Sequence, residues 1–376
     1  MIYLDHNATT PVLPEVREAM LPFLTEEWGN PSSSYRFGSH LKSGIERARE
    51  QVADLIGANS ACEVLFTSGG TESNNTAIHA AIHSTQKTHI VTSKVEHSSV
   101  LSYYRFLEEF RGYRVTYLPV NREGLITMAD LEDAIVSDTA LVSLMWANNE
   151  TGVLFPVEKI GELCRSRGVL YHCDAVQAVG KLAMKVEELP IDYLSLTGHK
   201  IGAPKGIGTL YAQKWAPFTP FLHGGHQERS RRGGTENVAG IIGLGTAAAV
   251  AQKKLPAYDA TVRPLRDALE EGLLAAVPNT ERNGHVIQRL PNTTNIFLPG
   301  MDSDATLTFL DSQNICASSG SACMESAITP SHVIQTMSGS HDRSSESIRF
   351  SLSPENTLEE VHEVLNKIEG LMSLID

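Results

Sequence analysis

The stretch Tyr193-Leu194-Ser195-Leu196-Thr197-Gly198-His199-Lys200 places a lysine directly after an apolar run of the length of a buried strand. A second run, Tyr171-His172-Cys173-Asp174, ends on an acid. Burial disfavours the ammonium form of a lysine, so Lys200 is a candidate for Schiff-base chemistry, and Asp174 is a candidate partner for the ring nitrogen of pyridoxal 5'-phosphate (PLP). The alternative is that Lys200 is a solvated loop lysine and Asp174 a turn residue at a strand end.

Short apolar runs and helical patterns alternate from about residue 47 to residue 215. A helical pattern at 45–56 precedes the first run, and helix-like segments at 72–78 and 157–165 separate later ones. This alternation predicts an α/β fold with a mainly parallel central sheet, whose ligands lie beyond the carboxyl ends of the strands. The runs predicted as strands are 64–67, 89–92, 115–118, 140–145, 169–172, 193–196 and 208–211.

The pattern changes after the small-residue segment 238–251 and Leu255-Pro256, where we expect the helix to break. Helix, strands and a final helix near 358–375 follow, which indicates a second, smaller α+β domain. We predict a large cofactor-binding domain of residues 14–253, and a small domain of residues 1–13 and 254–376 that carries Cys323.

Composition excludes several classes of protein. The net charge of -13 over 376 residues argues against direct binding to nucleic acid or to an anionic membrane surface. The N-terminus shows no basic and apolar leader and no long apolar stretch occurs, so we expect a cytoplasmic protein. The five cysteines include no C-x-x-C pair, which excludes an obvious zinc site and makes a disulfide framework unexpected.

Glycines follow the first predicted strand, in Ser68-Gly69-Gly70-Thr71, and a helical pattern follows them. Glycine lets the backbone approach a ligand, and the unpaired N–H groups and positive end of a helix attract anions. The segment therefore predicts a site for one phosphate. A capped turn without a ligand is the alternative interpretation.

Two further segments follow predicted strands. In Glu96-His97, a neutral imidazole could stack on a flat cofactor and move protons near neutral pH, although His97 alone is also compatible with an ordinary loop histidine. In Asn148-Asn149-Glu150-Thr151-Gly152, an amide could reach the same crevice, although an ordinary turn is equally compatible.

Cys323 ends the segment Ala317-Ser318-Ser319-Gly320-Ser321-Ala322-Cys323. These small polar neighbours differ from the apolar surroundings of a structural cysteine, and an accessible thiol can act as a nucleophile. An incidental surface cysteine is the alternative.

Taken in order, these motifs resemble the cysteine desulfurases of the NifS/IscS type over nearly the full chain. The resemblance rests on segments 3–10, 29–33, 67–75, 96–97, 148–152, 174–177, 198–200, 223–225, 232–235, 318–323 and 348–351. It implies the PLP-dependent transferase fold type I of the class V aminotransferase family, a homodimer, and conversion of L-cysteine to L-alanine with the sulfur passed on as a persulfide.

The resemblance also implies a role for each candidate residue. Lys200 would bind PLP covalently and remove the Cα proton, Asp174 would pair with the ring nitrogen, and His97 would stack on the ring. Gln177 would donate to the ring hydroxyl. The phosphate would be held by Gly70, Thr71, Thr197 and His199, with Thr235 donated across the dimer interface.

The substrate carboxylate would be held by Asn149 and Arg349, where a guanidinium offers bidentate pairing. Cys323 would attack the substrate sulfur. Thr197 stands where relatives usually carry serine, which preserves the hydroxyl. An acceptor protein of iron–sulfur cluster assembly, transfer RNA thiolation or DNA phosphorothioation is the expected destination of the sulfur.

Two rival functions stay open. The same fold and cofactor serve selenocysteine lyases and other PLP-dependent lyases or epimerases, which need no sulfur acceptor at Cys323. A non-enzymatic scaffold is the other, but a scaffold has no need of Lys200, Asp174 and His97 together.

Overall fold

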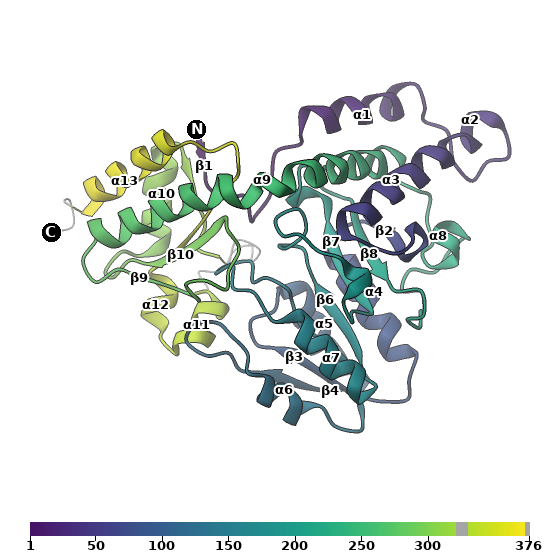
Figure 1. Cartoon of the computed structure of the whole chain (residues 1–376), viewed down its shortest axis with the longest axis horizontal. Coiled ribbons are helices and arrows are strands. Elements are labelled where there is room, and N and C mark those ends of the chain that lie inside the picture. The colour runs from purple at the N-terminus through teal and green to yellow at the C-terminus, as the bar shows by residue number, and fades with distance from the viewer. Residues whose placement is uncertain (321–329, 373–376) are drawn as a thin grey trace.

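A seven-stranded sheet with the order β2-β8-β7-β6-β5-β3-β4 forms the centre of the computed structural model, which describes residues 1–320 and 330–372 (Figure 1). Each strand lies on a run predicted from the sequence, with shifts of one or two residues at the ends. The strands are β2 (Val64–Thr67), β3 (His89–Ser93), β4 (Arg114–Leu118), β5 (Thr139–Ser143), β6 (Leu170–Asp174), β7 (Tyr193–Thr197) and β8 (Gly208–Ala212).

Most strands of this sheet are parallel. β4, β3, β5, β6 and β7 pair in parallel, whereas β8 runs antiparallel to both β7 and β2. β3, β5, β7 and β8 are buried along their whole length, as expected for a sheet covered on both faces. The predicted α/β fold with a mainly parallel sheet is therefore confirmed. Because β5, β6 and β7 are parallel, their carboxyl ends meet at one edge.

Helices cover the sheet and pack on one another. α4 contacts β7 and β8, α7 contacts β6, and both α1 and α3 pack on the long helix α9. α3 ends at Gly57, whose φ of 65° closes the helix in the left-handed conformation that glycine tolerates. The helices of this part are α1 (Pro14–Thr25), α2 (Arg36–Ser39), α3 (Leu41–Ile56), α4 (Gly70–His83), α5 (Ser98–Arg111), α6 (Met128–Ala134), α7 (Val157–Arg167), α8 (Gln227–Ser230) and α9 (Val238–Ala276).

A smaller part has its own core and two small sheets. β12, β10 and β9 form an antiparallel sheet in that order, and β1 pairs in parallel with β11. Its elements are β1 (Ile2–Tyr3), β9 (Glu281–Arg282), β10 (Thr293–Phe297), α10 (Ser303–Ser312), β11 (Ile315–Cys316), α11 (His332–Ser338), α12 (His341–Ser345), β12 (Ser347–Ser351) and α13 (Leu358–Met372). Its core joins residues from both ends of the chain, including Leu4, Phe350 and Val361. The two-domain division at residues 13/14 and 253/254 stays a prediction.

The expected helix break at Leu255-Pro256 is wrong, because α9 continues through Pro256 and Pro264 (Figure 1). A proline inside a helix removes one hydrogen bond and crowds the preceding turn, at a cost of about 3 kcal/mol. Burial of α9 at both ends offsets this cost. Leu244 belongs to the core under the central sheet, and Leu269 belongs to the core of the smaller part. Tertiary packing therefore outweighs the local signal.

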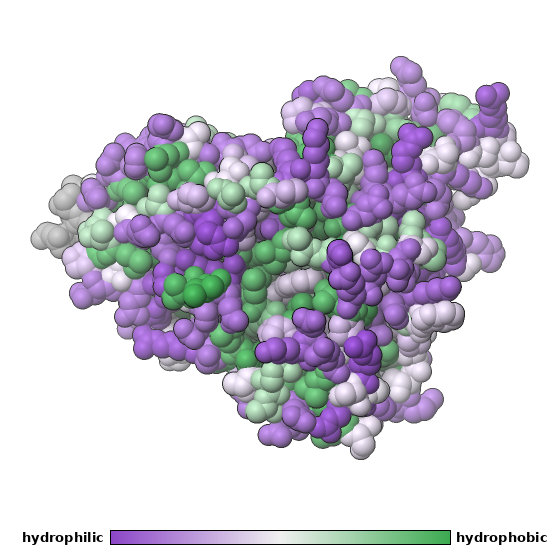
Figure 2. Space-filling model, viewed as in Figure 1, coloured by the Kyte–Doolittle hydropathy of each residue, from purple (hydrophilic) through white to green (hydrophobic). Residues whose placement is uncertain are grey.

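The N-terminal segment links the two parts. The Leu4 carbonyl accepts from the Ser351 N–H of β12, and the Thr10 N–H donates to the His199 carbonyl just after β7. On the face shown in Figure 2, hydrophobic residues gather at the centre, between the smaller part and the main sheet. Within residues 1–320 and 330–372, no helix combines the length and apolar character needed to cross a membrane.

Candidate active site

A cavity of about 360 Å³ opens at the carboxyl ends of the parallel strands, and most candidate residues line it. It brings together residues from β6, β7, the start of α4, the start of α5 and β12, which lie far apart in the sequence. The candidates that line it are Gly70, Thr71, His97, Asn149, Asp174, Gln177, Thr197, His199, Lys200 and Arg349. Thr235 is not among them, and Cys323 lies outside the described residues.

Lys200 lies in a turn of 3₁₀ helix, Gly198–Lys200, that directly follows β7. Its Nζ donates to the main-chain oxygens of Asn7 and Ala8, the latter at 2.7 Å. These carbonyls come from the N-terminal segment, so the smaller part of the molecule helps to place the amine. Lys200 is half-buried and reaches the cavity from the strand edge, as the sequence predicted.

Asp174 is the last residue of β6, and only 7% of its surface is exposed. Its Oδ2 accepts from Asn74 Nδ2 at 2.7 Å, and its Oδ1 accepts from the Val176 N–H at 3.0 Å. These two donors fix the orientation of the carboxylate. An anion held in this way suits a protonated ring nitrogen.

His97 is the N-cap of α5, and its Nδ1 accepts from the Ser99 N–H at 3.2 Å. In the neutral ring this contact leaves the proton on Nε2. Burial lowers the pKa of His97 below its ordinary value; the Asp174 carboxylate opposes this effect, and the Lys200 charge adds to it. We therefore expect a neutral imidazole at neutral pH, whose Nε2–H can donate a hydrogen bond.

One end of the cavity is formed by the first turn of α4 and by the residues around the end of β7. Gly208 approaches Gly69 so closely that a Cβ on Gly208 would lie 2.6 Å from the Gly69 Cα. This contact holds the start of α4 against the sheet and directs its N–H groups at the cavity. Burial lowers the pKa of His199 to about 4, and the Lys200 charge adds to this effect.

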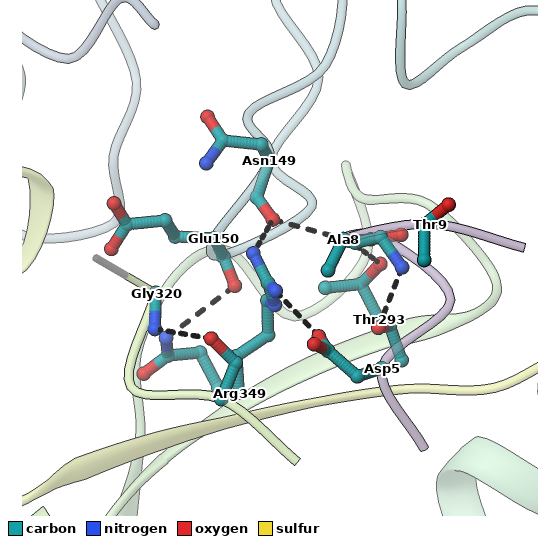
Figure 3. A network of polar contacts seen from close by, with 12 residues as sticks. Asp5, Ala8, Thr9, Asn149, Glu150, Thr293, Gly320 and Arg349 are labelled. Carbon is teal, nitrogen blue, oxygen red and sulfur yellow. Dashed lines mark hydrogen bonds and ion pairs between the residues drawn. The ribbon is translucent and has the colours of Figure 1, made fainter. Parts of the chain in front are cut away.

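Arg349, from β12, joins the smaller part to the cavity (Figure 3). Its Nη2 forms an ion pair with Asp5 Oδ1 at 2.6 Å, and its Nη1 donates to the Asn149 carbonyl at 3.0 Å. The side-chain amide of Asn149 points away from this guanidinium. Among the described residues, the buried Nε of Arg349 has no hydrogen-bond partner.

One candidate lies elsewhere. Thr235 is exposed and lines a separate pocket of about 110 Å³ together with Ser68. Cys323 lies outside the described residues. The nearest described residue before it, Gly320, lines the cavity in the left-handed region that favours glycine, with φ of 92°, and a Cβ there would lie 2.3 Å from Glu150 Oε2.

Sequence reasoning missed Asn7, Asn74 and Ser99, which also line the cavity. Asn74 is one helical turn after Gly70 on α4, so the spacing in the glycine segment could have indicated it. Ser99 is adjacent to the His97 motif. Asn7 lies in segment 3–10, but its role carried no local signal, because its contacts come from Thr293 of β10 and from Gln177 in the turn after β6.

The chain is similar in sequence and in structure to known proteins. The model of the family "Aminotransferase class-V" matches residues 2–364. "Cysteine desulfurase 2" of Trichormus variabilis is 51% identical over 366 residues, covering 97% of this chain and 91% of that protein. A solved "NIFS-LIKE PROTEIN" superposes with a TM-score of 0.93 at 35% identity, covering 99% of each chain. A structure described as "SspA in complex with cysteine" superposes with a TM-score of 0.83 at 35% identity, covering 95% of this chain and 100% of that one.

Proposed function

Because the chain belongs to the class-V aminotransferase family, and within it to the PLP-dependent cysteine desulfurases, we propose that its cavity converts L-cysteine to L-alanine and passes the sulfur to Cys323 as a persulfide. The observation that carries this proposal is the convergence of Lys200, Asp174 and His97 on one cavity at the sheet edge. A scaffold protein would need no such arrangement.

The residues of the cavity fit PLP. Asp174, oriented by two donors, faces a site for the ring nitrogen, and the first turn of α4 with Thr197 and His199 offers an anion site at the other end. Asn74 also lines this cavity, and its buried Oδ1 has no hydrogen-bond partner within the part of the chain that the structure describes. When bound, PLP supplies an electron sink for a carbanion at the substrate Cα. We assign covalent attachment and removal of the Cα proton to Lys200.

Arg349 and Asn149 are proposed to hold the substrate carboxylate. The unpartnered Nε of Arg349 is a buried donor that a carboxylate can satisfy, while Asp5 and the Asn149 carbonyl hold the rest of the guanidinium in place. The ion pair with Asp5 keeps this charge compensated when substrate is absent.

The sulfur transfer balances with Cys323 as the acceptor. The Cys323 thiolate forms a bond to the substrate sulfur, and the bond between Cβ and sulfur breaks. The electron pair of that bond stays on carbon, which then takes up a proton to give alanine, and the sulfur remains on Cys323 as a persulfide. An acceptor protein then removes this sulfur. Delivery to an iron–sulfur, transfer RNA or DNA modification system, and a cytoplasmic location, stay predictions.

A homodimer is the proposed assembly. Thr235 is exposed and outside the cavity of its own chain, which supports its donation to the phosphate end of a second copy. The exposed aromatic residues Phe106, Phe110 and Trp215 offer apolar surface that such an assembly could cover.

The function is tested by incubating the purified holoenzyme with L-cysteine and measuring alanine release and intact mass. We expect one added sulfur on the peptide that contains Cys323. Cys323→Ser should lose both the added mass and the alanine, whereas Lys200→Ala should also lose the visible absorbance of bound PLP. Alanine release that survives Cys323→Ser would instead favour a lyase that needs no sulfur acceptor.

A further inference from the structure

Lys181 is a second lysine near the cavity, and the proposed reaction does not use it. Only 5% of its surface is exposed. Its Nζ donates to Asn7 Oδ1 at 2.9 Å and to Gln177 Oε1 at 2.8 Å, and both of these partners are neutral amides. Burial of a lysine against neutral partners costs free energy that a methionine of similar size would avoid. A buried lysine at this position therefore points to a role beyond packing.

The ammonium group of a lysine donates hydrogen bonds and accepts none, so in that form Lys181 requires both amides to face it with their oxygens. With its Oε1 turned to Lys181, Gln177 directs Nε2 at the Asn7 carbonyl, 2.9 Å away. Asn7 Oδ1 accepts from Lys181 and also from Asn292 Nδ2 at 3.1 Å. Asn7 Nδ2 then faces Thr293 Oγ1 and the Asn149 carbonyl, at 2.9 and 3.2 Å. The second hydrogen of Gln177 Nε2 remains available for the cavity, which Gln177 lines.

The same Asn7 carbonyl that accepts from Gln177 also accepts from Lys200 Nζ. Lys181 is therefore connected to the amine of Lys200 through one residue, Asn7. It also holds the amide of Gln177, which donates to the Asn7 carbonyl. Lys181 also lines a second pocket of about 390 Å³, together with Pro11, Val12 and Lys200. Small molecules can approach the lysine stem from that pocket.

We propose that Lys181 is a positioning residue of this enzyme: it fixes the amides of Asn7 and Gln177 and, through the Asn7 carbonyl, the place of the Lys200 amine. The inference rests on the proposed function and adds a residue that touches neither substrate nor cofactor. Burial, and then the nearby charges of Lys200 and Arg349, lower the pKa of Lys181 well below its ordinary value, and either protonation state retains donors for both amides.

The test uses the holoenzyme of Lys181→Met, which keeps the volume but removes the donors. We expect kcat to fall by about ten- to a hundredfold with a smaller change in KM, because misplacement of a reacting group by about 1 Å can cost a hundredfold. The visible circular dichroism per bound PLP should also change, since that signal reports ring orientation. Lys185→Met, an exposed lysine paired with Glu188, is the matched control and should change neither.

A second variant, Lys181→Ala, tests the same role independently by chemical rescue. It leaves space for n-propylammonium, which matches the missing atoms and can enter from the second pocket. We expect this amine to restore part of the circular dichroism and kcat in Lys181→Ala, but not to raise either in the wild type.

The outcomes separate two kinds of failure. Unchanged circular dichroism and kcat in Lys181→Met, with an active wild type, would overturn the role of Lys181 alone. An inactive wild type would overturn the proposed function. Loss of folding in both variants without recovery by n-propylammonium would assign Lys181 to stability and also overturn the inference.

Discussion

Glu270 shows how one buried side chain holds the part of the molecule that supplies Arg349. Only 4% of its surface is exposed, and it accepts from Arg289 Nη2 at 2.8 Å, from Thr294 Oγ1 at 2.6 Å and from Arg282. These contacts join α9 to β9 and β10, next to β12. Although burial by itself would raise the pKa of Glu270, the hydrogen bonds from Arg289 and Thr294 outweigh it and lower the pKa to about 2.

Stability should therefore depend on Glu270 in acid. The folded-state pKa lies below that of an unfolded glutamate, near 4.3, so the contribution is complete above about pH 4.3 and is lost as the pH falls toward about 2. We expect Glu270→Gln to reduce the free energy of unfolding at pH 7 by about 3 kcal/mol, because two arginines lose their buried partner. Urea unfolding at pH 7 and at pH 2.5 measures both effects. An equal loss at the two pH values would contradict the assignment.

Helix α9 illustrates how two elements meet at a single glycine. A Cβ on Gly245 would lie 2.5 Å from the Cα of Ala48 on α3, so only glycine allows this approach. Gly245→Ala improves helix propensity by about 1 kcal/mol but forces two backbones apart. We expect a net loss of about 1 to 3 kcal/mol in the free energy of unfolding, measured by urea denaturation.

Gly272, on the same helix, is the matched control. A Cβ there would meet the side-chain end of Leu365, at 2.4 Å from Cδ1, and that end can rotate away. Gly272→Ala should therefore cost less than Gly245→Ala or stabilise the protein. The reverse order of the two variants would show that the contact with α3 does not limit the packing of α9.

These elements also mark how far the sequence alone could predict the structure. The strands were predictable because apolar runs bounded by turns are local signals, and the residues at their carboxyl ends follow from parallel pairing. The continuation of α9 through Pro256 was not predictable, because it depends on burial of both ends of the helix in two different cores. Asn7 and Lys181 were equally beyond reach, since their hydrogen bonds connect residues 7, 177, 181 and 293, and only the folded chain brings these together.

The complete site is proposed to need two chains, and mixed dimers can test this. Thr235→Ala alone should weaken PLP binding by about ten- to a hundredfold, because a hydrogen bond to a charged group contributes about 1.5 to 3 kcal/mol. Lys200→Ala alone should be inactive. If Thr235 serves the cavity of its partner, a dimer of one Thr235→Ala chain and one Lys200→Ala chain contains one intact site.

Random mixing of the two variants in equal amounts makes half of the dimers mixed, so about a quarter of the sites should be intact. At a PLP concentration that saturates the wild type but not Thr235→Ala, unfolding and refolding the mixture should restore about a quarter of the wild-type rate of alanine release. The same variants refolded separately and then assayed together provide the control. If Thr235 acted on the cavity of its own chain, every site would lack one of the two groups, and refolding together would restore no activity beyond that control.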